Sequence, residues 1–229
     1  MTIRDLIKRK LTKGDIFIII ANLIPVYGVW FEGWSATEAF IVYALETLII
    51  GLLTVLKLLI ATFVKGKDNW YNKGSSTMVS GFFFIFFFII HFGLFALVQT
   101  TIFSQAANIT PKGSSMMHFF FHWPSYINEE IGIMLAGFVV SYLFNNFLPF
   151  VVNADYRRKS MMLLMFEPYG RIFIQQFTVI LGSMFLSFGF GKGFILVFAL
   201  AKLFFDLYVN FEELMNKGMD EMEKKSTQQ

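Results

Sequence analysis

Long runs of apolar residues, separated by short polar or basic breaks, fill almost the whole chain. Most of the runs reach the ~20 residues that an α-helix needs to cross about 30 Å of hydrocarbon. The pattern predicts six membrane-spanning helices, over residues 15–31, 39–64, 79–103, 127–152, 169–188 and 193–214. It divides the chain into a basic, amphipathic N-terminal segment (1–14), a transmembrane domain (15–214) and a polar tail (215–229).

Composition supports an all-α, polytopic helical bundle in a lipid bilayer. Hydrophobic residues make up 56% of the chain and charged residues only 15%, whereas soluble domains carry about 25% charged residues. The 31 Phe residues exceed what a small soluble core would bury. With no Cys in the chain, disulfides and Cys-ligated metal sites are excluded.

The distribution of Lys and Arg predicts the orientation of the bundle. The two terminal segments and the second and fourth breaks carry 14 basic residues, whereas the alternate breaks carry 2. Because loops rich in Lys and Arg stay in the cytoplasm, both termini are expected to be cytoplasmic. Basic residues confined to such short runs are typical of membrane topology, so no nucleic-acid partner is expected.

Four charged residues lie well inside the predicted spans: Glu46, Lys57, Lys202 and Asp206. Glu46 and Lys57 are about 20° from the same face of one helix but about 16 Å apart along it, so each needs a partner on another helix. Lys202 and Asp206 are four residues apart and can pair directly. We expect a buried polar cluster whose ion pair is Asp206–Lys57 or Asp206–Lys202. The alternative is a self-satisfied network that only fixes helix packing.

Three histidines offer candidate chemistry. His91 falls at mid-membrane depth, where it suits a proton relay, a metal ligand or a packing contact. His118 and His122 have i,i+4 spacing, and Glu129 and Glu130 follow, so a weak divalent-metal site is one hypothesis.

The aromatic residues around these outer histidines favour an interfacial belt instead. No HExxH motif is present, and no His follows His122 in the later spans, as a rhomboid-like serine protease would require. Whether the protein is an enzyme therefore stays open.

Four stretches carry a family resemblance: YALETLIIGLLTVLK (43–57), HFGLF (91–95), PYGRI (168–172) and AKLFFDL (201–207). In these stretches the chain resembles domain of unknown function 6498 (DUF6498), an uncharacterised family of prokaryotic polytopic membrane proteins. The resemblance implies a prokaryotic inner (plasma) membrane location and a shared set of polar positions, which includes Arg171. It implies no reaction. The chain departs from the family at Gln99 and Gln176, where family members tend to carry His.

Three functional hypotheses follow. The first is a polar cavity that binds or transports a small polar or lipidic ligand or protons, built from Glu46, Lys57, His91, Arg171, Lys202 and Asp206. The second is an accessory or assembly subunit of a larger membrane complex, with partner subunits beside the lipid bilayer. The third is a membrane metalloenzyme that uses His118, His122 and Glu129 or Glu130.

Overall fold

The computed structural model describes residues 15–72, 75–106, 109–111, 113 and 117–208, with a few positions of the C-terminal segment. The predicted amphipathic segment 1–14 and most of the predicted tail lie outside the described residues. The described part contains these elements: α2 (Asp15–Phe31), α3 (Ala36–Lys65), β1 (Lys67–Asn72), β2 (Ser75–Ser80), α4 (Gly81–Ala106), α5 (His118–His122), the 3₁₀ helix η1 (Trp123–Tyr126), α6 (Glu129–Tyr142), the π-helical turn η2 (Leu143–Phe147), α7 (Leu148–Val152), α8 (Asp155–Arg158), α9 (Met161–Ser187) and α10 (Gly191–Tyr208).

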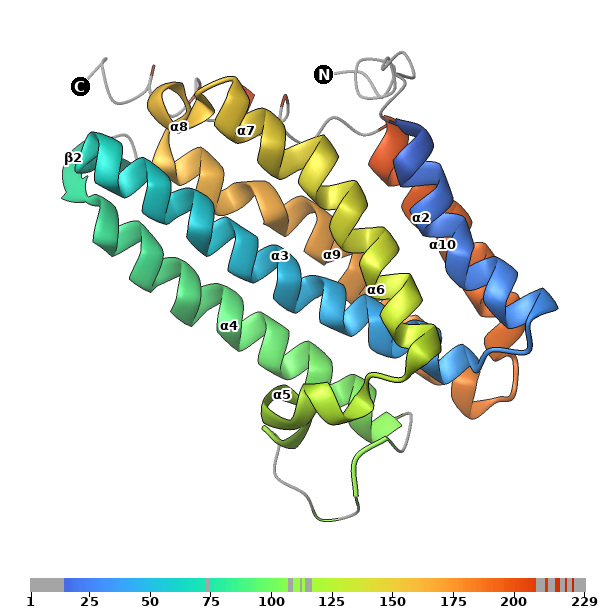
Figure 1. The fold of residues 1–229 in the computed structure, drawn as a ribbon. Helices are drawn as coiled ribbons and strands as arrows, with labels where there is room; N and C mark the ends of the chain where they lie inside the picture. Colours follow the sequence, from blue (N-terminus) through green and yellow to red (C-terminus); the bar gives the residue numbers. More distant parts are fainter. Residues whose placement is uncertain are drawn as a thin grey trace.

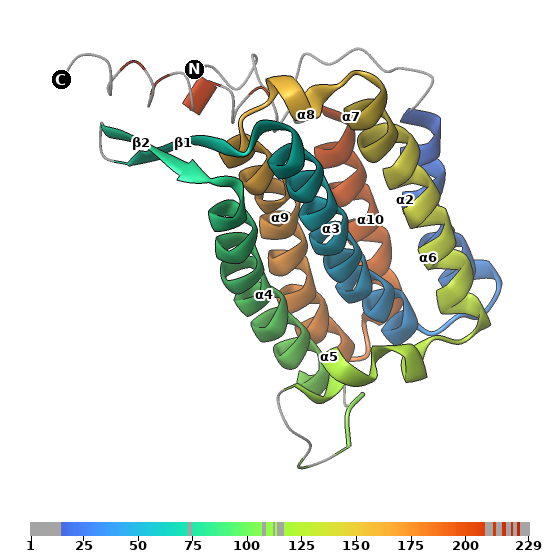
Figure 2. The same cartoon turned by 60° about the vertical axis from the view of Figure 1, so that its left-hand side comes forward.

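The long helices stand side by side as one bundle (Figure 1). Helix α3 packs against α4, α6 and α9, and α10 packs against α2 and α9. The β1–β2 hairpin, α7 and α8 lie at one end of the bundle, and α5 with η1 lies at the other (Figure 2). We call these the hairpin end and the α5 end. Helix α3 thus has neighbouring helices on several sides.

Hydrogen-bonded caps fix two helices at the α5 end. Ser35 begins α3 with a capping box: its Oγ accepts from the Thr37 N–H, and Glu38 accepts from the Ser35 N–H at 3.1 Å. Asn128 begins α6 by accepting from the Ile131 N–H at 2.9 Å. The Asn128 amide also donates to Glu38 at 2.5 Å. One glutamate therefore ties the start of α3 to the start of α6.

The hairpin end contains a short antiparallel β-hairpin that the all-α prediction did not include. Strand β1 pairs with β2 from Lys67↔Ser80 to Asn72↔Ser75. Gly66 ends α3 at φ +74°, a conformation that favours glycine. Asp68 then accepts from the backbone N–H of Met161 at 2.8 Å, so the hairpin supplies the first hydrogen bond of α9.

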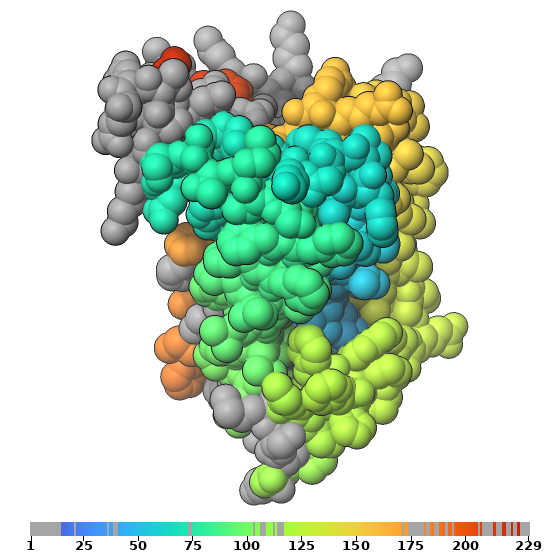
Figure 3. All heavy atoms as spheres, turned by 90° about the vertical axis from the view of Figure 1, so that its left-hand side faces the viewer, coloured from blue at the N-terminus to red at the C-terminus, as the bar shows by residue number. Residues whose placement is uncertain are grey.

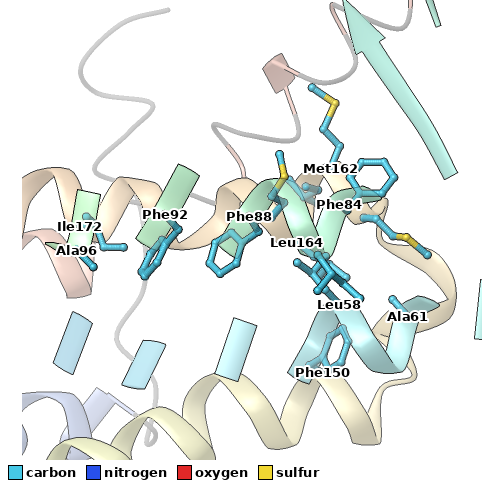
Figure 4. Packing of buried hydrophobic residues seen from close by; sticks show 14 residues of the cluster. Leu58, Ala61, Phe84, Phe88, Phe92, Ala96, Phe150, Met162, Leu164 and Ile172 are labelled. Carbon is cyan, nitrogen blue, oxygen red and sulfur yellow. The ribbon is translucent and has the colours of Figure 1, made fainter. Parts of the chain in front are cut away.

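Phenylalanines of α4 form the centre of the core at the hairpin end. Phe84, Phe88 and Phe92 follow one another along α4, and Leu58 of α3 and Phe150 of α7 lie in the same cluster (Figure 4). All five side chains are buried. The opposite face of α4 exposes further large apolar side chains, such as Phe86 and Ile90, which suits a helix in contact with hydrocarbon.

Three helical stretches are long and apolar enough to cross a membrane: Ile41–Lys65, Gly81–Ile102 and Glu129–Val152. Helix α2 and the stretch Ile195–Phe205 of α10 are apolar but shorter. The structure therefore supports a mostly helical protein with three candidate spans among the described residues, which is a coarser result than the six spans predicted.

Candidate functional site

Glu46 and Lys57, the two charged residues of α3, are both buried, and each finds its partner on another helix. This is the arrangement that their 11-residue spacing requires, because they share a face of α3 but lie about 16 Å apart. We name the two sites the Lys57 centre and the Glu46 centre.

The Lys57 centre consists of Lys57, Asn146 and Glu167. Lys57 Nζ lies 3.2 Å from Glu167 Oε2 and also donates to Asn146 Oδ1. Asn146 Nδ2 donates to Glu167 Oε1 at 2.9 Å. The three side chains therefore form a closed ring of hydrogen bonds, with one positive and one negative charge.

A π-helical turn places Asn146 in this centre. Residues Leu143–Phe147 are wound as a π-helix between α6 and α7. Such turns are rare and recur at functional sites. Asn145 and Asn146 are adjacent but act differently: Asn145 donates to the Ser141 carbonyl of its own helix at 2.9 Å, whereas Asn146 reaches across to α3 and α9.

The Glu46 centre joins α3 to α10. Lys202 Nζ lies 2.5 Å from Glu46 Oε2. Lys202 Nζ also lies 4.9 Å from the centroid of the Tyr43 ring and 5.6 Å from that of Phe138. Two aromatic faces thus add cation–π attraction to the ion pair.

The sequence predicted Asp206 as the acidic partner of Lys57 or Lys202, and among the described side chains each of these lysines has a glutamate partner. Lys57 pairs with Glu167 and Lys202 pairs with Glu46. The side chains of Asp206 and Arg171 lie outside the described residues, so an ion pair of Asp206 with either lysine stays a prediction.

Gln99 of α4 is buried, and neither its Oε1 nor its Nε2 has a hydrogen-bond partner among the described residues. Helix α4 runs antiparallel to α3, with Phe92 against Gly51 and Gly81 against Thr62. This register puts Gln99 within about one helical turn of the level of Glu46. A buried amide without partners calls for a bound water or ligand.

His91 pairs with a phenol. Its Nδ1 lies 2.7 Å from the Tyr169 hydroxyl of α9, and its ring stacks on Phe87 with centroids 5.4 Å apart. His91 is half-buried. A His–Tyr hydrogen bond can pass a proton or fix packing, so the proton-relay and the packing alternatives both fit this contact.

The structure does not bring the four candidate metal ligands together. The rings of His118 and His122 stack with centroids 4.3 Å apart. Their Nδ1 atoms contact the Tyr126 hydroxyl (3.3 Å) and the His118 carbonyl (3.0 Å). Glu129 and Glu130 line a separate cavity beside α2. Across the described part of the chain, no group of three or more His, Asp or Glu side chains could hold a metal ion.

The sequence pattern did not single out Glu167 and Asn146 as members of the Lys57 centre. The predicted fifth span began at Tyr169, directly after Pro168, which is a typical helix start. Helix α9 begins two turns earlier, at Met161, so Glu167 lies inside the bundle. For Asn146, the sequence does contain a signal: the two adjacent amides Asn145 and Asn146 interrupt an apolar run.

Fold and site together define a mostly helical protein with candidate membrane spans and two Lys–Glu centres between its helices. A family model, described as a family of unknown function (DUF6498), matches residues 6–228. The chain belongs to this family, in agreement with the resemblance found in its motifs. Neither the search of curated proteins nor that of solved structures found a match.

Proposed function

We propose that the protein is a six-span membrane protein that binds or transports a small polar or lipidic ligand or protons at the Glu46 and Lys57 centres. Both termini face the cytoplasm, and the membrane is the plasma membrane of a prokaryote. The observation that carries the proposal is a pair of lysines inside the bundle, the buried Lys57 and the partly buried Lys202, each matched to a glutamate on a different helix.

The arrangement of the helices supports six spans. Helices α2, α9 and α10 run alongside the three long apolar stretches (Figures 1 and 2). If those three stretches cross a bilayer, their neighbours in the bundle cross the same layer. The excess of 14 basic residues over 2 supports the orientation.

Energetics favour a functional role for the charged centres over a purely structural one. A buried ion pair gives little net stability, because desolvation offsets the Coulomb attraction, and well-packed apolar residues often replace it without loss. Ionisable residues in membrane spans therefore mark ligand, ion or proton sites by default. The amide of Gln99, near the level of Glu46, has no hydrogen-bond partner in the described part of the chain and adds a polar group to which a ligand or water could bind.

Proton flux tests the proposal directly. The protein would be reconstituted in liposomes that enclose a pH-sensitive dye, and a potassium diffusion potential would drive proton entry. We expect Glu46→Gln to lower the flux about tenfold or more, and the double variant Glu46→Gln/Lys202→Gln to stay equally inactive. If the ion pair were only structural, the double variant should regain flux relative to Glu46→Gln. Removal of both charges would then restore the packing that removal of one disturbs.

Mass spectrometry of protein purified in nanodiscs covers ligands other than protons. A small molecule that accompanies the wild type and is absent from Glu46→Gln would support the proposal. Flux at the level of empty liposomes, together with a stoichiometric protein partner that both variants retain, would contradict it and assign the chain to the accessory-subunit hypothesis.

A further inference from the structure

An apolar groove lies between the helices at the α5 end, and no charged residue of the two centres lines it. Its volume is about 510 Å³, and its lining includes Leu48 and Leu52 of α3, Ile89 and Gly93 of α4, Leu135 of α6 and Trp123 of η1. Figure 3 shows a hollow here, between α4 and the α5–α6 segment, with α3 at its floor. A volume of about 300–1,000 Å³ is typical of ligand pockets.

The groove opens sideways onto the apolar surface of the bundle. Leu52 and Ile89 line it and are also exposed, by 63% and 47%. Under the proposed membrane location, this rim faces the hydrocarbon of the bilayer. An empty hollow there would leave its walls without dispersion contacts, so lipid is the available occupant.

We propose that the groove holds a single acyl chain of a bilayer lipid, which enters from the α5 end beside Trp123. A helix from a partner protein does not fit, because a helix with its side chains is about 10–12 Å wide and this volume would hold roughly one turn of it. A flexible hydrocarbon chain fills a narrow apolar hollow without leaving a polar group unsatisfied. The indole of Trp123 suits the interfacial region where the chain joins its headgroup.

Gly93 keeps the wall of the groove open. An added Cβ at Gly93 meets no atom within 4 Å, although the residue lies in the interior of α4. Glycine is unfavourable in a helix interior relative to alanine. Space for a ligand accounts for its presence here, whereas at Gly51, on the floor, the ring of Phe92 already occupies the space.

The test uses Trp123 as a reporter for brominated lipid, whose bromine atoms quench indole fluorescence on contact. Trp30, Trp34 and Trp70 would be changed to Phe in the full-length protein, leaving Trp123. The protein would be placed in vesicles of dioleoyl phosphatidylcholine with rising fractions of its brominated counterpart. We expect quenching with a saturable component, complete at a low fraction of brominated lipid.

Gly93→Leu fills the groove and should remove the saturable component. Gly132→Leu is the matched control, because Gly132 also has open space around its Cβ but does not line the groove; it should keep the component. Gly93→Ala fills less space and should reduce the saturable component of quenching. This variant replaces Gly93→Leu in the test if the leucine variant fails to insert into the membrane.

Two other outcomes would overturn the inference, and they are distinguishable. Quenching that rises only in proportion to brominated lipid, equally in all variants, would show ordinary lipid around the bundle and no bound chain. No quenching in any variant would show that Trp123 does not reach the bilayer. That second result would contradict the placement of the α5 end at the membrane surface, on which the inference rests, whereas the first would leave that placement intact.

Discussion

Lys57 Nζ lies 3.2 Å from Glu167 Oε2, although 110 positions separate the two residues along the chain. This contact ties α3 to α9 inside the bundle, and Asn146 closes it from the π-helical turn. A buried lysine with only 2% of its side chain exposed is tolerable because its charge is neutralised and hydrogen-bonded. The stability of the bundle should therefore depend on keeping the pair matched.

Removing one member of this pair should cost more than removing both. Glu167→Gln alone leaves the Lys57 charge buried without its counter-charge, which is expected to cost about 3–5 kcal/mol of unfolding free energy. Glu167→Gln/Lys57→Met removes both charges and should recover most of that loss. Thermal unfolding in detergent, monitored by size-exclusion chromatography, ranks the stability of the wild type, the single variant and the double variant. A double variant less stable than the single one would contradict the interpretation.

Asn146 and Asn145 provide a matched pair of adjacent amides. Asn146→Ala removes hydrogen bonds to both Lys57 and Glu167 and should cost about 1–3 kcal/mol, since two charged groups inside the bundle each lose a hydrogen bond. Asn145→Ala removes a bond within its own helix and should cost about 1 kcal/mol or less. The same unfolding assay compares them. Equal losses of unfolding free energy in the two variants would show that the contacts of Asn146 with Lys57 and Glu167 contribute no more than the bond of Asn145 within its helix.

The sequence predicted much of the helical framework because each apolar run ends at a polar or basic break. It also predicted that Glu46 and Lys57 would need partners on other helices, since helical geometry keeps them about 16 Å apart. Which helix supplies each partner depends on tertiary packing, and periodicity along one helix carries no information on that.

Two features of the fold depend on details that hydropathy does not record. The start of α9 at Met161 relies on Asp68, a residue of the hairpin 93 positions away. The inward direction of Asn146 relies on the extra residue of the π-helical turn. Both features are needed to form the Lys57 centre, so its full membership could not be predicted from the sequence.

Two glycines on facing helices should respond oppositely to alanine. A Cβ at Gly51 would lie 2.5 Å from the ring of Phe92, which is itself buried. Gly51→Ala should therefore lower the unfolding free energy by about 1–3 kcal/mol, through forced movement of a packed ring. Gly93→Ala meets no atom within 4 Å and should raise it by about 0.5–1 kcal/mol, because alanine favours the helix. Melting temperatures in detergent give the sign of each change, and equal signs would contradict the packing described.

Opposite ends of the bundle should be accessible from opposite sides of the membrane. The chain has no native Cys, so single cysteines report without background. Ser76 of the hairpin and Ser125 of η1 are both exposed, and the hairpin and the α5–η1 segment lie at opposite ends of the bundle (Figure 2). With both termini cytoplasmic, a membrane-impermeant maleimide added to intact spheroplasts should label Ser125→Cys and spare Ser76→Cys. Lysis before labelling should make both react, which controls for burial. Labelling of Ser76→Cys alone in intact spheroplasts would reverse the orientation, and labelling of both would show that the bundle does not separate these ends across a bilayer.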